Sequence, residues 1–292
     1  MNLKINYSKV KMPKVSVIIP CYNLGRFVEE TVDSVLASSF QDFEIIVVND
    51  GSKDEYTNQL LSNFNKPRTK IITTINQGVV KARNTAVQNS SGKYILPLDA
   101  DDKISPDYIK DAVEYLESHP NTGIVYCNAV MFGERSGDFV LPEYTIEGML
   151  AQCLIFVTAF FRREDYNAIG GWDPDMDYYF EDWDFWLSVI ERGREVYKIP
   201  KVHFYYRMVG NSRTHTRDWV EEKKLGVVTK NLFRKHTALY VEHFQNPISL
   251  YAQLLREKNG AKEQMQWIYN TADYRLGNKI LKPFRFLKNI FK

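Results

Sequence analysis

The sequence predicts an α/β fold in which a mostly parallel, Rossmann-like sheet is covered by helices on both faces. Short apolar runs alternate with amphipathic helical segments over about the first 120 residues, and several of these runs end in a polar turn. Strands buried on both faces read as continuous apolar runs, because neither face of such a sheet meets water. Ligands of open parallel sheets bind beyond the carboxyl ends of the strands, so the polar turns are the first candidates for a site.

The first half of the chain is expected to hold four strands and three helices. The strands are expected at 15–20, 43–48, 70–75 and 94–98, and the helices at 26–38, at 78–89 and from Ser105 onward. Val28, Val32 and Val35 share one face of the first helix, as the period of an amphipathic helix requires. Ser105 is expected to cap the third helix, with Pro106 in its first position.

The second half is less regular. Strands are expected at 123–132, 154–161, 195–199 and 202–207, a helix at 181–192, and helical structure from Asp218 onward. We therefore divide the chain into an N-terminal extension (1–12), an α/β domain (13–215) and a C-terminal helical extension (216–292).

Composition and charge exclude several classes of protein. A formal net charge of +2 argues against a nucleic-acid partner. Cys21, Cys127 and Cys153 lie far apart, which favours neither a disulfide framework nor a zinc site. Neither a signal peptide nor a run long enough for a membrane span is apparent, so we expect a cytoplasmic protein.

The last residues form a basic, amphipathic pattern. One helical face of 279–292 would be apolar, and the basic residues interleave with it without any acidic residue: Ile280, Phe284, Leu287 and Phe291; Lys279, Lys282, Arg285, Lys288 and Lys292. Such a helix can lie on anionic lipid, which would place the protein peripherally on the inner face of the cytoplasmic membrane. The alternative is a packed terminal helix with a solvated basic face.

Three carboxylates follow the strand at 94–98. Asp99, Asp101 and Asp102 fall within four residues, and carboxylates so close repel one another. A divalent cation relieves this repulsion, and oxygen ligands suit Mg²⁺ or Mn²⁺, which bind through one or two carboxylates plus substrate phosphates. The alternative is an acidic turn that caps the next helix.

Two common phosphate-binding loops are missing. The sequence has neither a GxxxxGK[ST] loop nor a GxGxxG after the first strand, which argues against a P-loop enzyme and a dinucleotide-dependent oxidoreductase. Phosphates would instead be held by a metal on the acidic cluster and by a basic side chain such as Arg83.

Several motifs together resemble glycosyltransferase family 2. They are Val15–Asn23, Ile45–Ser52, Asn76-Gln77-Gly78, Ala82-Arg83-Asn84, Leu98–Asp102, Gly170–Asp173 and Glu181-Asp182. Their order and spacing are those of the family, and the resemblance covers about residues 13 to 210. It implies a GT-A fold over 13–215 and an inverting transfer of a sugar from a nucleotide-sugar.

The resemblance also implies roles for the motif residues. Pro20, Tyr22, Asn23 and Asp50 would hold the nucleoside, with Tyr22 stacking on the base. Arg83 would contact the nucleotide or its diphosphate. Asp99 would contact ribose or metal, and Asp101 would ligate the metal. Whether Asp102 is a further ligand or supports one is left open.

Asp182 takes the position of the family's catalytic base. Its neighbours Glu181 and Asp184 could instead cap the N-terminus of their helix.

A third metal ligand could come from His215 or His203, because some relatives supply one after the last strands. Residues 205–213 resemble the family's variable closing loop. The QxxRW pattern of processive polysaccharide synthases is absent from the sequence. Its absence favours an enzyme that adds a single sugar.

The sequence therefore predicts a transferase that uses Mn²⁺ or Mg²⁺ and a nucleotide-sugar donor, expected to be a UDP-sugar. Its acceptor would be a glycan or a lipid-linked saccharide, such as an undecaprenyl-linked one, in the assembly of a surface polysaccharide. Two alternatives remain: a nucleotidyltransferase that makes a nucleotide-sugar, and an inactive GT-A domain that acts as a scaffold.

Overall fold

The computed structural model describes residues 12–176, 180–209, 221–244, 247–271 and 276. The chain divides into two compact units, Met1–Leu239 and Tyr240–Lys292. The first unit contains the α/β domain. The division predicted at 215/216 remains a prediction, as does the tail helix at 279–292, which lies outside the described residues together with His215.

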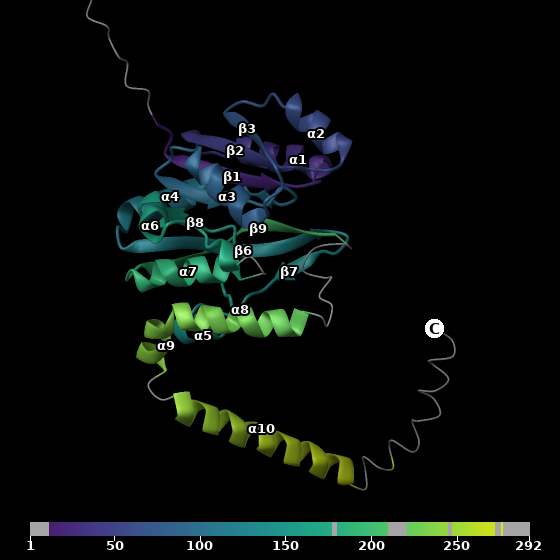
Figure 1. Ribbon diagram of the computed structural model, residues 1–292, viewed down its shortest axis with the longest axis vertical. Coiled ribbons are helices and arrows are strands. Elements are labelled where there is room, and N and C mark those ends of the chain that lie inside the picture. Colours follow the sequence, from purple (N-terminus) through teal and green to yellow (C-terminus); the bar gives the residue numbers. More distant parts are fainter. Residues whose placement is uncertain (1–11, 177–179, 210–220, 245–246, 272–275, 277–292) are drawn as a thin grey trace, which may run out of the picture. The chain divides into compact units, whose positions relative to one another are not determined.

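Strands and helices alternate through the first unit as predicted (Figure 1). In chain order the elements are β1 Val15–Cys21, α1 Gly25–Leu36, β2 Phe43–Asp50, α2 Glu55–Ser62, β3 Thr69–Thr74, α3 Val79–Gln88, β4 Tyr94–Pro97, β5 Lys103–Ile104, α4 Tyr108–Ser118, β6 Thr122–Gly133, β7 Gly137–Phe139, α5 Ile146–Ala151, β8 Phe160–Arg162, α6 Arg163–Ile169, the short 3₁₀ helix Pro174–Met176, α7 Glu181–Glu191, β9 Glu195–Met208, α8 Glu221–Lys235 and α9 Thr237–His243.

One sheet joins the strands of the described residues in the order β3-β2-β1-β4-β8-β6-β9-β5, with β7 added beside β6. Strands β3, β2, β1 and β4 are parallel, and β6 is parallel to β9. β8 runs antiparallel between β4 and β6 and so joins the two parallel parts. The carboxyl ends of β1, β2 and β4 consequently meet at one edge of the sheet, as predicted.

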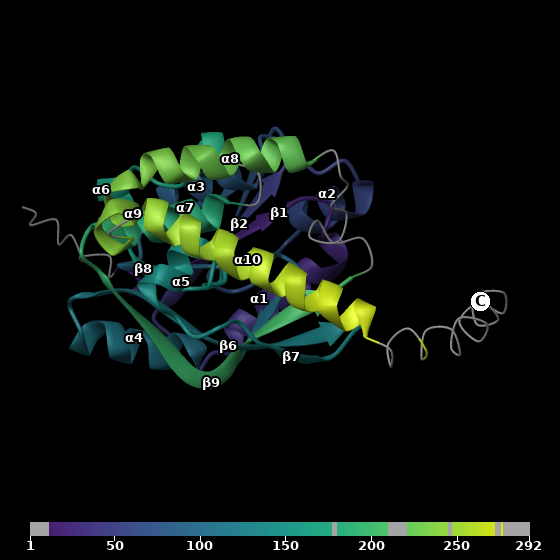
Figure 2. The same ribbon diagram turned by 90° about the horizontal axis from the view of Figure 1, so that it is seen from below.

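Helices cover both faces of this sheet (Figure 2). Alternate residues of β1, including Val17 and Ile19, pack with α1 and α4 in one fully buried cluster. Helices α3, α6 and α7 lie on the opposite side, where Ile18 and Ile46 are also buried. Both faces of the strands are therefore removed from water, which is why the strands read as continuous apolar runs.

Two strand predictions are wrong. In the predicted strand 154–161, only its last two residues belong to a strand, β8. Leu154 and Ile155 are buried without pairing to the sheet, and an apolar run does not reveal how it is buried. The two strands predicted at 195–199 and 202–207 form the single strand β9. Its pairing with β6 shifts between Ile199 and Val202, so Pro200 lies at an irregularity that tolerates proline.

Helix α4 begins later than predicted. Its first residue is Tyr108, and the capping position is taken by Asp107, whose side chain makes no capping bond to the helix and accepts from the Ser39 hydroxyl instead. The Ser105 hydroxyl bonds to Nδ1 of His203 instead of capping a helix. The Pro106 carbonyl accepts a hydrogen bond from the Ser39 amide at 2.8 Å, which ties this turn to the end of α1.

The second unit contributes α10 (Pro247–Asn270), a single uninterrupted helix (Figure 2). Among the described residues, none of the helices combines the length and the apolar character that crossing a membrane would demand.

Candidate active site

The loops that follow β1, β2 and β3 are bound to one another at the carboxyl edge of the sheet. Asp50, the last residue of β2, accepts hydrogen bonds from the amides of Gln77 and Gly78 at 3.0 and 2.9 Å, and from the Thr74 hydroxyl at 3.2 Å. Gly51 adopts a positive φ of 61°, and a Cβ there would lie 2.4 Å from the Asn76 nitrogen. The motif Asn49–Ser52 therefore brings the second and third loops into contact.

Asn23 connects the first loop to the second. Its φ is 55°, a left-handed conformation that asparagine tolerates better than most residues. Its side-chain oxygen accepts from the amides of Lys53 and Asp54 at 2.7 and 3.2 Å, and its own amide donates to the Ser52 hydroxyl. The neighbouring Tyr22 is 37% exposed, so its ring is accessible at the rim of the site, whereas Pro20 is buried within β1.

The acidic turn lies beyond β4. Asp99 is 35% exposed at its side chain, while the whole of Asp102 is only 2% exposed. Asp102 accepts a 2.7 Å hydrogen bond from the Arg207 amide, and its own amide bonds to the Asp99 carbonyl. The Asp102 carboxylate therefore joins the turn to the end of β9, and its role toward a metal stays a prediction.

The electrostatics of the turn follow from burial and like charge. Burial raises the pKa of Asp101 to about 6, and the Asp99 carboxylate adds to this shift, whereas the positive charges of Arg207 and Arg26 lower the pKa. Burial, followed by Asp101 and Asp99, raises the pKa of Asp102 well above its usual value. An added cation would therefore stabilise the charged forms of these groups.

Arg207 of β9 is bound on several sides. Its Nε donates to the Asp101 carbonyl at 2.6 Å, and its guanidinium pairs with Glu30 of α1. The guanidinium also lies over the rings of Phe27 and Phe132, at 4.5 and 4.3 Å from their centroids. Sequence reasoning placed this residue only in a variable loop, because its partners come from distant parts of the chain.

Arg83 of α3 is the buried centre of the site. It is 3% exposed and pairs with Asp99 through one terminal nitrogen at 3.0 Å and with Glu181 through the other at 3.1 Å. Its Nε and the second oxygen of Glu181 are buried, and neither has a hydrogen-bond partner among the residues that the structure describes. Arg83 thus connects the acidic turn to the N-terminus of α7.

The next residue, Asn84, explains two further motifs. Its side chain accepts hydrogen bonds from the Trp172 amide at 3.0 Å and from the Tyr166 hydroxyl, and it donates to the Trp172 carbonyl. Gly171 has a φ of 91°, and a Cβ there would lie 2.7 Å from the Asn84 side-chain oxygen. The Gly-Gly-Trp-Asp motif therefore holds α3 against the segment that precedes α7.

Asp182, the predicted base, is half-buried in the first turn of α7. Burial is the main cause that raises its pKa to about 7, with a further contribution from Glu181, while Arg83 lowers it. One of its oxygens accepts from the Trp183 amide at 2.7 Å. The Trp183 indole donates to the Met149 carbonyl, which fixes this turn against α5.

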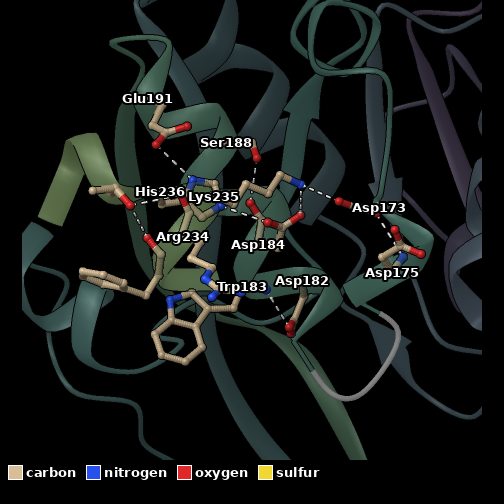
Figure 3. Close-up of polar contacts among 12 residues, drawn as sticks. Asp173, Asp175, Asp182, Trp183, Asp184, Ser188, Glu191, Arg234, Lys235 and His236 are labelled. Atoms are coloured by element: carbon tan, nitrogen blue, oxygen red, sulfur yellow. Dashed lines mark hydrogen bonds and ion pairs between the residues drawn. The ribbon is translucent and has the colours of Figure 1, made fainter. Parts of the chain in front are cut away.

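The capping roles considered for Glu181 and Asp184 are wrong. The residue at the N-cap of α7, Phe180, makes no side-chain capping bond, and Glu181 pairs with Arg83. Asp184, 2% exposed, pairs with Lys235 at 2.7 Å and His236 at 2.9 Å, both near the end of α8. Figure 3 shows these side chains meeting between the helices, while Asp182 points away from them.

This cluster holds α7 in place. Lys235 also pairs with Asp173 at 2.9 Å, and His236 lies 3.0 Å from Glu191 at the other end of α7 (Figure 3). The orientation of the helix that carries Asp182 is therefore fixed by ion pairs on the side opposite to Asp182. No local pattern in the sequence predicts these pairs, because they join residues about 50 positions apart.

The predicted metal ligands are only partly brought together. Asp99 and Asp101 lie in the same turn, but in the part of the chain that the structure describes, no group of three or more acidic, histidine or cysteine side chains is arranged to hold a metal ion. His203 is engaged by Ser105 and by Asp111, at 3.1 Å from the latter, so both of its ring nitrogens have partners. Two carboxylates suit Mg²⁺ or Mn²⁺ when substrate phosphates complete the coordination.

The motifs and the fold have counterparts among known proteins. The family model described as glycosyl transferase family 2 matches residues 16–176, more than half of the chain. The chain belongs to this family. It is 30% identical over 248 residues to the putative teichuronic acid biosynthesis glycosyltransferase TuaG of Bacillus subtilis, covering 81% of this chain and 96% of that protein.

Longer relatives match as well. The hyaluronan synthase of Pasteurella multocida is 27% identical over 287 residues, covering 96% of this chain but 28% of that protein. The chain also spans 28% of the length of a chondroitin synthase from the same species.

The structure resembles that of S. aureus TarS 1–349 in complex with UDP-GlcNAc. The TM-score is 0.63 at 20% sequence identity, over 78% of this chain and 66% of that one. A second crystal structure of the same protein, in complex with UDP, gives a TM-score of 0.57 at 22% identity over 89% of this chain. These likenesses establish the GT-A fold that the sequence predicted.

The buried bridge leads to a prediction about stability. Replacing Arg83 with Met leaves the Glu181 carboxylate buried and unpaired, so we expect a loss of about 3 kcal/mol in the free energy of unfolding. Urea unfolding measures this loss. The double variant Arg83→Met, Glu181→Leu removes both charges and should recover a large part of it. An Arg83→Met protein as stable as the wild type would show that the bridge contributes nothing.

Proposed function

We propose that this protein is an inverting, metal-dependent glycosyltransferase that moves one sugar from a nucleotide-sugar to a saccharide acceptor. One observation carries the proposal. The predicted base, Asp182, adjoins Glu181, which the buried Arg83 connects to the acidic turn at Asp99. An in-line displacement at a sugar carbon requires a base and a group that stabilises the departing diphosphate. Asp182 would be the base, and the acidic turn would hold a cation for the diphosphate.

The nucleoside would occupy the edge formed by the first three loops. Asp50 presents a carboxylate fixed by three protein donors, and carboxylate oxygens can accept further hydrogen bonds from a base. Tyr22 offers an accessible ring for stacking. Asn23 would act mainly by keeping the loops together. The complexes of TarS with UDP-GlcNAc and with UDP support a UDP-sugar as the donor.

Asp99 and Asp101 would hold Mg²⁺ or Mn²⁺ together with the donor's diphosphate. The ion would stabilise the negative charge that develops on the leaving nucleoside diphosphate. The shared burial and like charge of the turn support this role, because an ion there would relieve the repulsion between Asp101 and its neighbours.

Asp182 would accept the proton of the acceptor hydroxyl. The hydroxyl oxygen then forms a bond to the anomeric carbon, while the bond from that carbon to the diphosphate oxygen breaks and its electron pair leaves with the nucleoside diphosphate. A single displacement inverts the anomeric centre and needs no covalent intermediate on the protein. A base with a pKa of about 7 is well matched to work near neutral pH.

The acceptor is proposed to be a glycan or lipid-linked saccharide of a surface polysaccharide. The names of the relatives from Bacillus subtilis and Pasteurella multocida support this class of product. The basic residues of 279–292 would hold the enzyme on anionic lipid, close to a lipid-linked acceptor such as an undecaprenyl-linked one.

A panel of nucleotide-sugars tests the proposal most broadly. Bound donor stabilises the native state, so a UDP-sugar at a hundred times its dissociation constant should stabilise by about 2.7 kcal/mol. We expect a rise in melting temperature with UDP-sugars that depends on Mn²⁺ or Mg²⁺. No protection by any member would contradict the proposal. Release of pyrophosphate from UTP would identify a nucleotidyltransferase, and binding of a protein partner without turnover would identify a scaffold.

The base assignment predicts a loss of turnover without a loss of donor binding. Asp182→Asn removes the proton acceptor, so we expect a fall in kcat of at least about a hundredfold with unchanged affinity for UDP. Because Asp182 must be ionised, wild-type turnover should fall about tenfold for each pH unit below about 7. The residual turnover of the Asp182→Asn variant should not show this fall at acidic pH. Undiminished turnover by Asp182→Asn would remove Asp182 from the mechanism.

A further inference from the structure

Two arginines share one aromatic ring beside the acidic turn. The Arg207 guanidinium lies 4.5 Å from the centroid of the Phe27 ring, and the Arg26 guanidinium lies 4.5 Å from the same centroid. Arg207 reaches the turn directly through its 2.6 Å bond to the Asp101 carbonyl. Both arginines favour the charged form of the Asp101 carboxylate, so both stand within electrostatic reach of it.

The two arginines differ in how they are bound. The side chain of Arg207 is 11% exposed and committed to Glu30, to Asp101 and to two rings. Arg26 is exposed, and in the described part of the chain no hydrogen bond or ion pair engages its guanidinium. A guanidinium has five N–H donors in a planar fork, which suits two phosphate oxygens at once.

Helix stability does not explain a cation at this position. Arg26 is the second residue of α1, and the first turn of this helix has no acidic residue. The residue at its N-cap, Leu24, makes no side-chain capping bond. The N-terminus of a helix carries partial positive charge, so a cation there is unfavourable. The Phe27 ring supports the guanidinium from one side and leaves its donors available to an anion.

We propose that Arg26, with Arg207 as its fixed neighbour on Phe27, binds the diphosphate of the nucleotide-sugar. This inference rests on the proposed function, because it takes the acidic turn as the place where a cation and the diphosphate meet. Arg207 holds the Asp101 end of the turn in position, and Arg26 supplies free donors beside it. The pair would also stabilise the nucleoside diphosphate as it leaves.

The chain offers a matched control for this pair. Lys103 pairs with Glu30 at 2.6 Å, and its ammonium lies 4.4 Å from the Phe132 ring centroid. Arg207 contacts the same two residues. Within the residues that the structure describes, the Lys103 side chain makes no hydrogen bond or ion pair with the acidic turn. Lys103→Gln therefore removes a cation from the same surroundings without removing a proposed phosphate ligand.

Calorimetric titration with UDP and with uridine, both in the presence of Mn²⁺, tests the proposal. Arg26→Gln should weaken the binding of UDP by about tenfold, the effect of losing one charge-assisted contact, and leave uridine unchanged. Arg207→Lys keeps the charge but loses the Nε donor, so it should also weaken UDP selectively. Lys103→Gln should change neither ligand. Because Arg26 is exposed, its variant is expected to fold normally, which the melting temperature checks.

Three results would overturn the inference. Unchanged UDP binding by Arg26→Gln would remove Arg26 from the site, and an equal loss for UDP and uridine would mean that the loop, not a phosphate contact, was altered. Unchanged UDP binding by a folded Arg207→Lys would remove Arg207 from the pair. Failure of the wild-type protein to bind UDP at all would instead contradict the proposed function itself, so the two failures are distinguishable.

Discussion

A single buried guanidinium connects the two halves of this site. Arg83 lies between Asp99, at the carboxyl edge of the sheet, and Glu181, at the start of the helix that carries the proposed base. Burying one unpaired charge is costly, so the buried Arg83 and Glu181 depend on each other, and the partly exposed Asp99 is a second partner of Arg83. The position of α7 relative to the acidic turn is consequently set by a charge requirement as well as by apolar packing.

The rest of the site extends this arrangement. On the far side of α7, Asp184 pairs with Lys235 and His236, so the helix is held by ion pairs on both sides (Figure 3). On the far side of the turn, the Arg207 side chain donates a hydrogen bond to the Asp101 carbonyl. The backbone amide of Arg207 donates another to the Asp102 carboxylate. Asp99 and Glu181 thus share Arg83, and Asp184 pairs with Lys235. The Asp102 carboxylate accepts instead from a backbone amide. We propose Asp101 as the member of the turn that would meet an added cation.

Much of this could be predicted from the sequence, and the exceptions have physical reasons. The turns at Asp50 and Asp99 follow apolar strands, and parallel pairing must bring them to one edge. The partners of Arg83 and Arg207 could not be predicted, because Glu181 and Asp101 lie about a hundred positions from them and no short pattern links them. Long-range pairs depend on tertiary packing, which periodicity does not encode.

A crystal of the protein with UDP and Mn²⁺ would show whether the acidic turn binds a divalent cation together with a nucleoside diphosphate, on which the proposed chemistry depends. Anomalous scattering locates the manganese without ambiguity. We expect the ion in direct contact with a carboxylate oxygen of Asp101 and with the diphosphate of UDP. Manganese and diphosphate bound together away from Asp99 and Asp101 would contradict the proposed site.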